Sequence, residues 1–406
     1  MARRKIREHD AKKIIADAIP ELGFKSVLIT PETNVETLPE RFHWLLQEKL
    51  TIKPDQLFGK RKKHGLVLID AAFQGVKDFL QQYRNKEFTI NDTEDILTHF
   101  IIEPFVPHHK EYYLAITSER DHDTIHFSET GGIDIEENWD NVKTIQIPTF
   151  TNIDEVKLEF LDNSEIENKE KITSFIKELY KAFRDLDFTY LEINPFTFDN
   201  DGKIVLLDTV ARIDDCASFK GQWDLEFPRE FGKRQYQEEL HIEELDRKSG
   251  ASLKLTILNP DGKIWNILGG GGASIIYLDM ITNLGHGKEI ANYGESSGNP
   301  SMEESYEYAR SILELMTKNN GKVLFIVGGI ANFTDVRSTF KGTIKALEEY
   351  ADQLKDVTIF VRRGGPHHEE GLRLMKGTGE KLGIRMYVHG PETSMPEIIT
   401  IAGGSL

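Results

Sequence analysis

The second half of the sequence repeats one pattern four times: a strand-like apolar segment, a glycine-containing loop and a helical stretch. The strand-like segments, from about residue 255 onward, are KIWNIL, KVLFIV, VTIFV and IRMYV. Strands that alternate with helices in this way predict a parallel, doubly wound sheet. Because ligands of such sheets bind at the carboxyl ends of the strands, the loops after these segments are candidate binding loops.

These loops suit an anionic ligand. Glycines let a ligand approach the backbone, and the helix N-termini that follow offer free N–H groups and a positive dipole end. Arg363 carries a planar fork suited to a carboxylate, whereas Asn332 or Thr334 can instead serve as a helix N-cap. The pattern predicts a polycarboxylate or phosphate site, with candidate residues 269–272, Asn292, Gly298, Asn332, Thr334, Arg362 and Arg363.

The first half of the sequence has a different order of predicted helices and strands. Helical stretches such as REHDAKKIIADAI alternate with short strands such as LTIKP and EYYLAIT, and many strands are joined by short turns. This predicts antiparallel sheets with helices on one side. A chain of 406 residues is too long for one ordinary core. We therefore expect an α+β domain over residues 1–240 and an α/β domain over residues 241–406.

A basic segment in the first half indicates a phosphate site. Lys53 lies in the strand-like segment LTIKP, the loop GKRKKHG follows at residues 59–65, and a second strand-like segment comes after it. Cations and backbone N–H groups arranged in this way can cover nucleotide phosphates. No GxxxxGK[ST] motif occurs, so the segment is not a P-loop. The alternative is an edge-strand lysine beside a solvated basic loop.

The stretch TYLEINPFTFDNDGKIVLLD, residues 189–208, reads as a β-hairpin around the turn signal DNDG. Asn194 and Asp208 fall at corresponding places on its two arms, and Glu192 shares a face with Asn194. Mg²⁺ prefers oxygen ligands from a few carboxylates or amides, together with phosphate and water. The hairpin is a candidate magnesium site beside a triphosphate; the alternative is an exposed polar face.

Composition narrows the class of protein. The formal net charge of −17 argues against general nucleic-acid binding, which needs a basic surface. No run of about 18 apolar residues occurs, so no membrane span is expected. The N-terminus lacks the apolar region of a secretory signal. Cys216 is the single cysteine and has no intrachain disulfide partner, so we expect a cytoplasmic protein.

Several long motifs together resemble the ATP-citrate lyase family. They are IKPDQL, FIIEPFVPH, YLEINP with LLD, LDRKSGASLKL, ANFTD and VRRGGP, and the resemblance runs essentially from end to end. More narrowly, the chain resembles the smaller A subunit of the two-subunit enzyme, which is homologous to the succinyl-CoA synthetase β-subunit. The resemblance implies an ATP-grasp domain followed by a Rossmann-like or flavodoxin-like citrate-binding domain.

The resemblance assigns nucleotide-binding roles residue by residue. Lys53 and Arg61 match nucleotide-binding positions, Pro104 and Val106 match backbone contacts to the base, and Glu111 matches the ribose-side carboxylate. The basic loop departs from the family pattern, since Arg61 is followed by lysine rather than by glycine.

The remaining assignments concern metals and citrate. Asn194 and Asp208 match the magnesium ligands of the nucleotide fold. A second metal near the subunit contact is implied at Asp246, Ser249 and Ala251. Citrate-contacting positions are matched by Gly298, Asn332, Thr334, Tyr350 and Arg363.

The resemblance also implies a partner. The family's reaction uses a phosphorylated histidine, and none of the 13 histidines lies in the family's phosphohistidine loop. His286 is interpreted as a loop residue, and His367 and His368 as rim residues rather than metal ligands. No catalytic residue is therefore expected here, and a larger B subunit is expected to supply the histidine and a citrate-synthase-like domain.

The implied activity converts citrate, CoA and ATP to acetyl-CoA, oxaloacetate, ADP and phosphate through phosphohistidine, citryl phosphate and citryl-CoA. Its cofactors are ATP and Mg²⁺, with CoA in the complex, and its setting is a cytoplasmic hetero-oligomer of the reductive TCA cycle. The alternatives are a citryl-CoA synthetase large subunit, a succinyl-CoA synthetase β-subunit, or a non-catalytic binding protein of the same fold.

Overall fold

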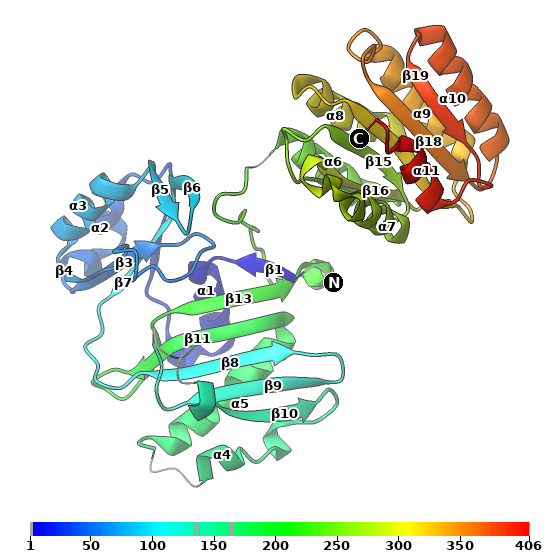
Figure 1. Cartoon of the computed structure of the whole chain (residues 1–406). Coiled ribbons are helices and arrows are strands. Elements are labelled where there is room, and N and C mark those ends of the chain that lie inside the picture. The colour runs from blue at the N-terminus through cyan, green and yellow to red at the C-terminus, as the bar shows by residue number, and fades with distance from the viewer. Residues whose placement is uncertain (1–2, 133–134, 136–138, 163–165, 235, 406) are drawn as a thin grey trace. The chain divides into compact units, whose positions relative to one another are not determined.

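The computed structural model describes residues 3–132, 135, 139–162, 166–234 and 236–405. The chain forms two compact units, Met1–Lys233 and Arg234–Leu406 (Figure 1). Each unit contains hydrophobic clusters of its own. Among the described residues, no helix combines the length and the apolar character that a bilayer crossing requires.

A large antiparallel sheet forms most of the first unit. Its strand order is β1-β13-β11-β8-β9-β10, and β12 pairs with β11. The strands are β1 (Arg3–Ile6), β8 (Tyr112–Ser118), β9 (His122–Ser128), β10 (Lys143–Pro148), β11 (Phe188–Phe198), β12 (Ile204–Leu206) and β13 (Thr209–Asp214). The hairpin expected at residues 189–208 is confirmed by the pairing of β11 with β12.

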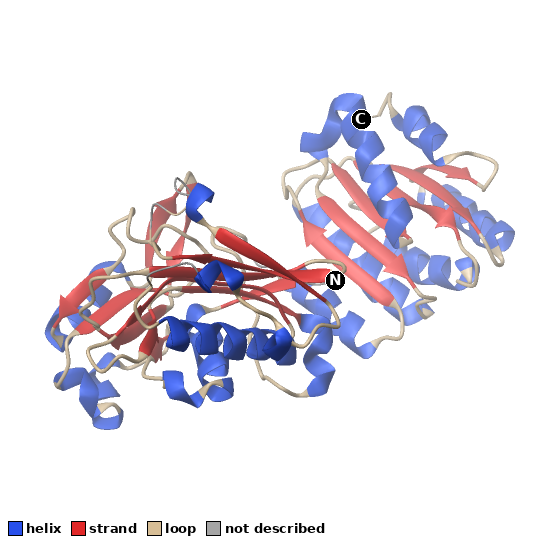
Figure 2. Cartoon of the chain, turned by 90° about the horizontal axis from the view of Figure 1, so that it is seen from below, coloured by secondary structure: helices blue, strands red, loops and turns tan. Residues whose placement is uncertain are grey.

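One face of this sheet is covered by helices α1 (Glu8–Ala18) and α5 (Lys169–Asp185). Figure 2 shows the sheet nearly edge-on with its long helices on one side. Leu191 and Ile193 of β11 point into that core, whereas Tyr190 and Glu192 alternate onto the other face. Because side chains alternate between the two faces of a strand, the YLEIN segment directs its polar side chains away from the core.

A smaller antiparallel sheet in the first unit has the order β2-β7-β3-β4. Its strands are β2 (Val27–Ile29), β3 (Leu50–Pro54), β4 (Leu68–Ala71) and β7 (Phe100–Pro104), and a separate hairpin is formed by β5 (Lys86–Ile90) and β6 (Thr93–Leu97). The unit's other α-helices are α2 (Leu38–Arg41), α3 (Phe73–Tyr83) and α4 (Glu159–Asp162).

The second unit is built on a six-stranded sheet with the order β14-β16-β15-β17-β18-β19. Its strands are β14 (Ser252–Ile257), β15 (Ile264–Gly269), β16 (Asn292–Ser297), β17 (Val323–Ile330), β18 (Thr358–Gly364) and β19 (Arg385–His389). Its α-helices are α6 (Gln237–Lys248), α7 (Gly271–Ile281), α8 (Met302–Lys318), α9 (Val336–Glu349), α10 (His368–Leu382) and α11 (Met395–Ala402).

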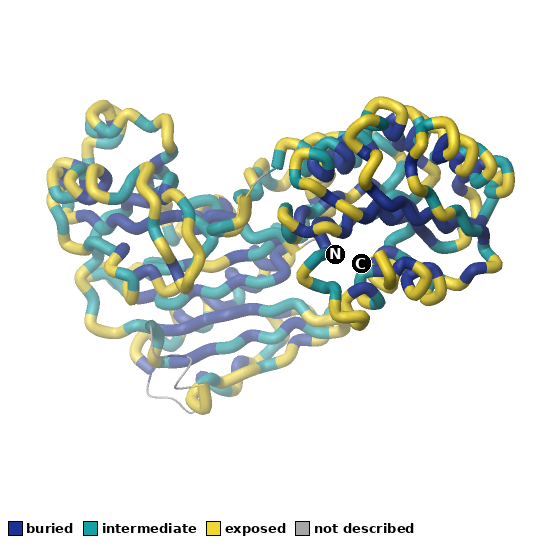
Figure 3. The backbone as a smooth tube through the Cα atoms, turned by 45° about the horizontal axis from the view of Figure 1, so that its top comes forward, coloured by how far each residue is buried: buried dark blue, intermediate teal, exposed yellow. Residues whose placement is uncertain are grey.

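Helices cover both faces of this sheet. Helices α6, α8, α9 and α10 pack over one face, and α7 and α11 pack over the other. Figure 3 shows the strands as a buried layer between more exposed helices. The loops after β15 and β17 leave toward opposite faces, so the carboxyl ends of these adjacent parallel strands form the switch point where such folds bind ligands.

The predicted parallel sheet is confirmed for the four strand–loop–helix repeats, and two further strands were missed. The antiparallel edge strand β14 is the segment SLKLTI; it overlaps the motif LDRKSGASLKL, in which no strand was predicted. Strand β16 is the segment NYGESS, which was expected to be a loop. Because NYGESS has only one aromatic and no β-branched residue, its own propensity does not indicate a strand; pairing with β14 and β15 holds it in place.

The prediction that Asn292 lies in a ligand-binding loop is also wrong, because Asn292 is the first residue of β16. It is fully buried at the amino end of β16, opposite the strand end where the loops lie. Its Oδ1 accepts from the Asn266 N–H at 2.8 Å and its Nδ2 donates to the Asn266 carbonyl at 2.9 Å. The Asn266 Nδ2 returns a 3.0 Å bond to the Asn292 carbonyl. These side chains bridge β15 and β16 where direct backbone pairing is missing.

We expect Asn292→Ala to lower the free energy of unfolding of the second unit by about 3 kcal/mol, because two buried backbone groups of Asn266 lose their partners. Chemical denaturation of the full chain measures this change. The matched control is Asn320→Gly at an exposed left-handed position (φ 55°), where glycine is tolerated without strain. Equal stability of the two variants would contradict the bridging role.

Candidate functional site

Two buried cations lie together in the first unit. Lys53 is buried in β3, and its Nζ lies 2.7 Å from Glu8 Oε1 and 2.7 Å from the Leu207 carbonyl. Arg61 is buried in a run of turns, where its carbonyl accepts the Leu66 N–H at 3.0 Å. The structure therefore brings together the strand lysine and the loop arginine that the sequence assigned to one phosphate site.

The expected metal ligands lie next to these cations. The Asn194 N–H donates to the Asp208 carbonyl at 3.0 Å, so the two residues are backbone neighbours. Asp208 Oδ1 accepts from Arg61 and lies 3.6 Å from Lys53 Nζ. Asn194 Oδ1 accepts the Gly132 N–H at 2.7 Å. The candidate metal ligands and phosphate cations thus form one polar cluster beside the end of β3, at the middle of β11 and at the connection from β12 to β13.

Three charged residues of this cluster were not found from the sequence. Glu8 and Lys12 lie one turn apart in α1, 2.7 Å from each other, and Lys12 also contacts Glu103 at 2.8 Å. Burial alone would lower the pKa of Lys12, but Glu103 and Glu8 raise it above its ordinary value. The only sequence signal was an i,i+4 acid–base pair, which usually marks an exposed helix face.

The segment assigned to the base and ribose follows the small sheet directly. Pro104 ends β7, and the Phe105 N–H donates to the Lys49 carbonyl at 2.7 Å. His108 Nδ1 lies 2.7 Å from the Val106 carbonyl, and His108 Nε2 lies 3.1 Å from Glu111 Oε1. One histidine therefore ties Val106 to Glu111, so both lie in one ordered connection from β7 to β8.

In the second unit, Arg363 is the central feature of the switch point. It is buried at the end of β18, where its Nη1 donates to the Gly269 carbonyl at 2.7 Å and the Gly329 carbonyl at 3.1 Å. No carboxylate of the described residues is paired with it. Burial lowers its pKa to about 10, which reflects a guanidinium with too little counter-charge. Such a group is prepared to receive an anionic ligand.

A cavity opens beside Arg363 at the strand ends. Its lining includes Ser296, near the end of β16, and the buried Thr334, from the loop after β17. Helices α8 and α9 contribute further hydroxyl groups. The lining residues are Ile267, Leu268, Gly269, Ser296, Ser305, Tyr308, Ile326, Val327, Thr334, Thr339, Phe340, Thr343 and Arg363.

The loop residues expected to contact citrate take different positions. The N-cap of α9 is Asp335, whose side chain accepts the Ser338 N–H at 3.0 Å, so the alternative capping role of Asn332 or Thr334 is wrong. Asn332 is exposed on the loop. Gly298 follows β16 with φ 77°, a conformation that favours glycine. These residues border the same strand ends as Arg363.

Tyr350 is the exception. It follows the last residue of α9, whereas Thr334 precedes the first turn of that helix. A 14-residue helix is ~21 Å long, so the two residues lie at opposite ends of it. The expectation that Tyr350 joins Thr334 and Arg363 in one citrate site of this chain does not fit the structure.

The expected second metal site surrounds the turn from α6 to β14. Asp246 Oδ1 accepts the Leu253 N–H at 2.7 Å, and its Oδ2 contacts Lys254 Nζ at 2.6 Å. Ser249 Oγ accepts the Ala251 N–H at 2.9 Å. The three residues are adjacent, but a metal ion would have to displace these internal contacts, so the assignment stays a prediction.

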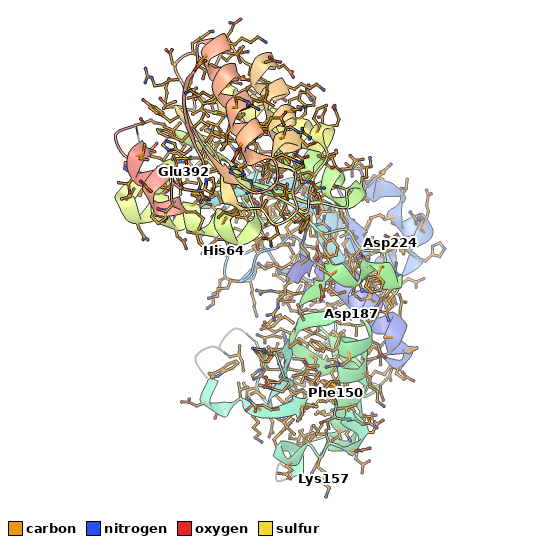
Figure 4. All side chains as sticks on the ribbon, turned by 90° about the vertical axis from the view of Figure 1, so that its right-hand side faces the viewer. His64, Phe150, Lys157, Asp187, Asp224 and Glu392 are labelled. Atoms are coloured by element: carbon orange, nitrogen blue, oxygen red, sulfur yellow. The ribbon has the colours of Figure 1, made fainter. Side chains whose placement is uncertain are left out.

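His367 and His368 have local hydrogen-bond partners. His367 Nδ1 lies 3.0 Å from Asp335 Oδ2, and His368 Nδ1 lies 2.7 Å from the Gly365 carbonyl. His286 ends a short irregular turn after α7. In the first unit, His64 lies at the end of the basic loop and is labelled in Figure 4. The placements of His286, His367 and His368 match their interpretation as loop and rim residues.

Comparisons with known proteins give consistent results for both units. The family description "ATP-citrate synthase ATP-grasp domain" matches residues 2–223, and "ATP citrate lyase citrate-binding" matches residues 233–404. ATP-citrate synthase alpha chain protein 2 of Arabidopsis thaliana is 46% identical, over 98% of this chain and 97% of that protein. Human ATP-citrate synthase is 44% identical, over 94% of this chain but only 36% of the human protein.

Solved structures agree. The structure of ATP citrate lyase from Methanothrix soehngenii in complex with citrate and coenzyme A covers 99% of both chains, with 45% identity and a TM-score of 0.90. An ATP citrate lyase structure from Methanosaeta concilii in complex with (3S)-citryl-CoA covers 99% of both chains, with 44% identity and a TM-score of 0.89. The expected fold class, an ATP-grasp domain followed by a parallel-sheet domain, is confirmed.

Proposed function

The chain belongs to the ATP-citrate synthase family, also called ATP-citrate lyase, and we propose that it supplies the ATP and citrate sites of a hetero-oligomeric enzyme. The enzyme converts citrate, CoA and ATP to acetyl-CoA, oxaloacetate, ADP and phosphate. The observation that carries the proposal is Arg363: a buried guanidinium held by two backbone carbonyls, beside a hydroxyl-lined cavity at the switch point.

Citrate would bind at the second unit's strand ends. One carboxylate would pair with Arg363 in a charge-assisted bond, and Thr334 and Ser296 would add hydroxyl contacts. Gly298 and Asn332 are proposed to complete the site from the neighbouring loops. A site that hydrogen-bonds the citrate hydroxyl would reject succinate, because its polar groups would remain unpaired.

ATP would bind in the first unit. Lys53 and Arg61 would contact the phosphates, and Pro104, Val106 and Glu111 are proposed to contact the base and ribose. Phosphoryl transfer needs positioning and charge stabilisation more than covalent chemistry from the protein. The buried cations, fixed by surrounding carbonyls and carboxylates, provide both.

Asn194 and Asp208 are proposed to hold Mg²⁺, which would neutralise phosphate charge during transfer. Their oxygens fit this role, since they are an amide and a carboxylate on adjacent backbone. In the structure Asp208 is paired with Arg61 and Lys53. Loading of the site would therefore release Asp208 from these cations as phosphates take its place.

A partner chain is proposed to complete the enzyme. It would carry the phosphorylated histidine and the domain that cleaves citryl-CoA, and CoA would bind in the complex. The human relative supports this division, because it contains far more sequence than the part matched here. A second metal at Asp246, Ser249 and Ala251, a cytoplasmic location and a place in the reductive TCA cycle also remain proposals.

Calorimetric titration of the full chain with citrate, and with succinate as the control, tests the citrate site. We expect citrate to bind and succinate to show no measurable heat. Tighter binding of succinate would contradict the citrate assignment and favour a succinyl-CoA synthetase β-subunit. If neither ligand binds the isolated chain, the same titration on the assembled enzyme tests whether the partner completes the site.

A further inference from the structure

We propose that Glu8 is a positioning residue of the nucleotide site: its carboxylate holds Lys53 and Arg61 in place and remains their counter-ion when Asp208 moves to the metal ion. The inference rests on the proposed ATP site of the first unit. It adds a residue from the N-terminal helix to a site otherwise assigned to the sheets and their loops.

The start of α1 is fixed against strand β3. Asp55, the residue after β3, accepts the Glu8 N–H at 2.8 Å and the His9 N–H at 3.1 Å. The Arg7 side chain donates to the Asp55 carbonyl at 3.2 Å. These bonds satisfy free N–H groups in the first helical turn and fix the start of α1 against the end of β3. The segment Lys53–Asp55 therefore supplies Lys53 and also fixes the position of helix α1, which carries Glu8, the counter-ion of Lys53.

The Glu8 carboxylate bridges two different elements. Its Oε1 lies 2.7 Å from Lys53 Nζ and 2.7 Å from Lys12 Nζ. Its Oε2 lies 2.8 Å from Arg61 Nη2. This last contact is an ion pair without hydrogen-bond geometry, and Oε2 has no hydrogen-bond donor among the described residues. The Arg61 guanidinium is therefore held near Glu8 by charge, while one of its N–H groups remains directed at Asp208.

Glu8 and Asp208 differ in their surroundings. The Glu8 side chain is 2% exposed, whereas that of Asp208 is 38% exposed. Asp208 can exchange its partners for a metal ion and water, but Glu8 cannot. Once Asp208 turns to the metal, Lys53 and Arg61 retain Glu8 as the closest fixed carboxylate.

The electrostatics of Glu8 agree with this role. Burial alone would raise the pKa of Glu8, but Lys12, Lys53 and Arg61 together hold it well below the ordinary value. The carboxylate is therefore ionised at neutral pH. A buried charge that keeps several partners is costly to remove, because those partners are left without compensation.

Titration of the full chain with ATP in the presence of MgCl₂ tests the inference. We expect Glu8→Gln to raise the ATP Kd by about tenfold or more and to leave citrate binding unchanged. Asp17→Asn, at an exposed position of the same helix, is the matched control. Wild-type affinity in a folded Glu8→Gln chain would overturn the inference. Failure of the wild-type chain itself to bind ATP would instead overturn the proposed nucleotide site.

A double variant separates positioning from charge balance. Glu8→Gln with Lys12→Met removes one carboxylate and one cation, so the cluster keeps its net charge. We expect an ATP Kd that remains raised in the folded double variant, because Lys53 and Arg61 still lack their anchor. An ATP Kd restored to the wild-type value would show that Glu8 only balances charge, and the inference would be wrong.

Discussion

Replacing Arg363 by alanine is expected to weaken citrate binding about a hundredfold or more, because a desolvated charge-assisted pair is lost. The guanidinium is buried, and carbonyls rather than carboxylates hold it. A citrate carboxylate would therefore be its first counter-ion within reach. Arg363→Lys should recover only part of the loss, since lysine keeps the charge but not the planar fork.

Calorimetric titration with citrate measures this effect, and Arg373→Ala on the exposed face of α10 is the matched control. Because Arg363 also bonds the Gly269 and Gly329 carbonyls, thermal unfolding of each variant is recorded beside the titration. A folded Arg363→Ala chain that binds citrate with the wild-type Kd would move the citrate site away from this switch point.

The second unit was the easier part to predict from the sequence. Apolar strands, glycine-containing loops and helices follow one another over short distances, so local patterns were sufficient for four of its strands. Strand β16 was missed because its segment is polar and its stability comes from pairing on both sides. The bridging role of Asn292 was missed for the same reason, since it depends on Asn266, 26 residues away.

In the candidate sites too, residues within local motifs were predicted, whereas residues that depend on distant contacts were missed. Residue patterns placed Lys53 and the basic loop at a phosphate site and Asp208 at a neighbouring metal site, and the family resemblance singled out Arg61. The structure brings their side chains together. Glu8 gave no such signal, because its burial arises from the docking of α1 on Asp55, 47 residues away. Tyr350 shows the converse: a match in sequence did not reveal that the length of α9 separates it from Thr334.

Asp208→Asn is expected to lower ATP-dependent turnover of the assembled enzyme about a thousandfold, because a neutral amide replaces the carboxylate that would hold the metal. Citrate binding by the chain should be unchanged, since the substitution lies in the first unit. Turnover is measured with the partner chain at saturating ATP and Mg²⁺. Asp201→Asn, at an exposed position of the turn between β11 and β12, is the matched control.

The Asp208→Asn variant also distinguishes two roles of the Asp208 carboxylate: pairing with the cations Arg61 and Lys53, and binding Mg²⁺. In the structure its carboxylate already neutralises part of Arg61 and Lys53, so its removal leaves these cations more attractive to a triphosphate. ATP titrated without Mg²⁺ should then bind Asp208→Asn at least as tightly as the wild type, and adding Mg²⁺ should no longer strengthen binding. If Mg²⁺ strengthens ATP binding equally in both chains, the metal ligand is not Asp208.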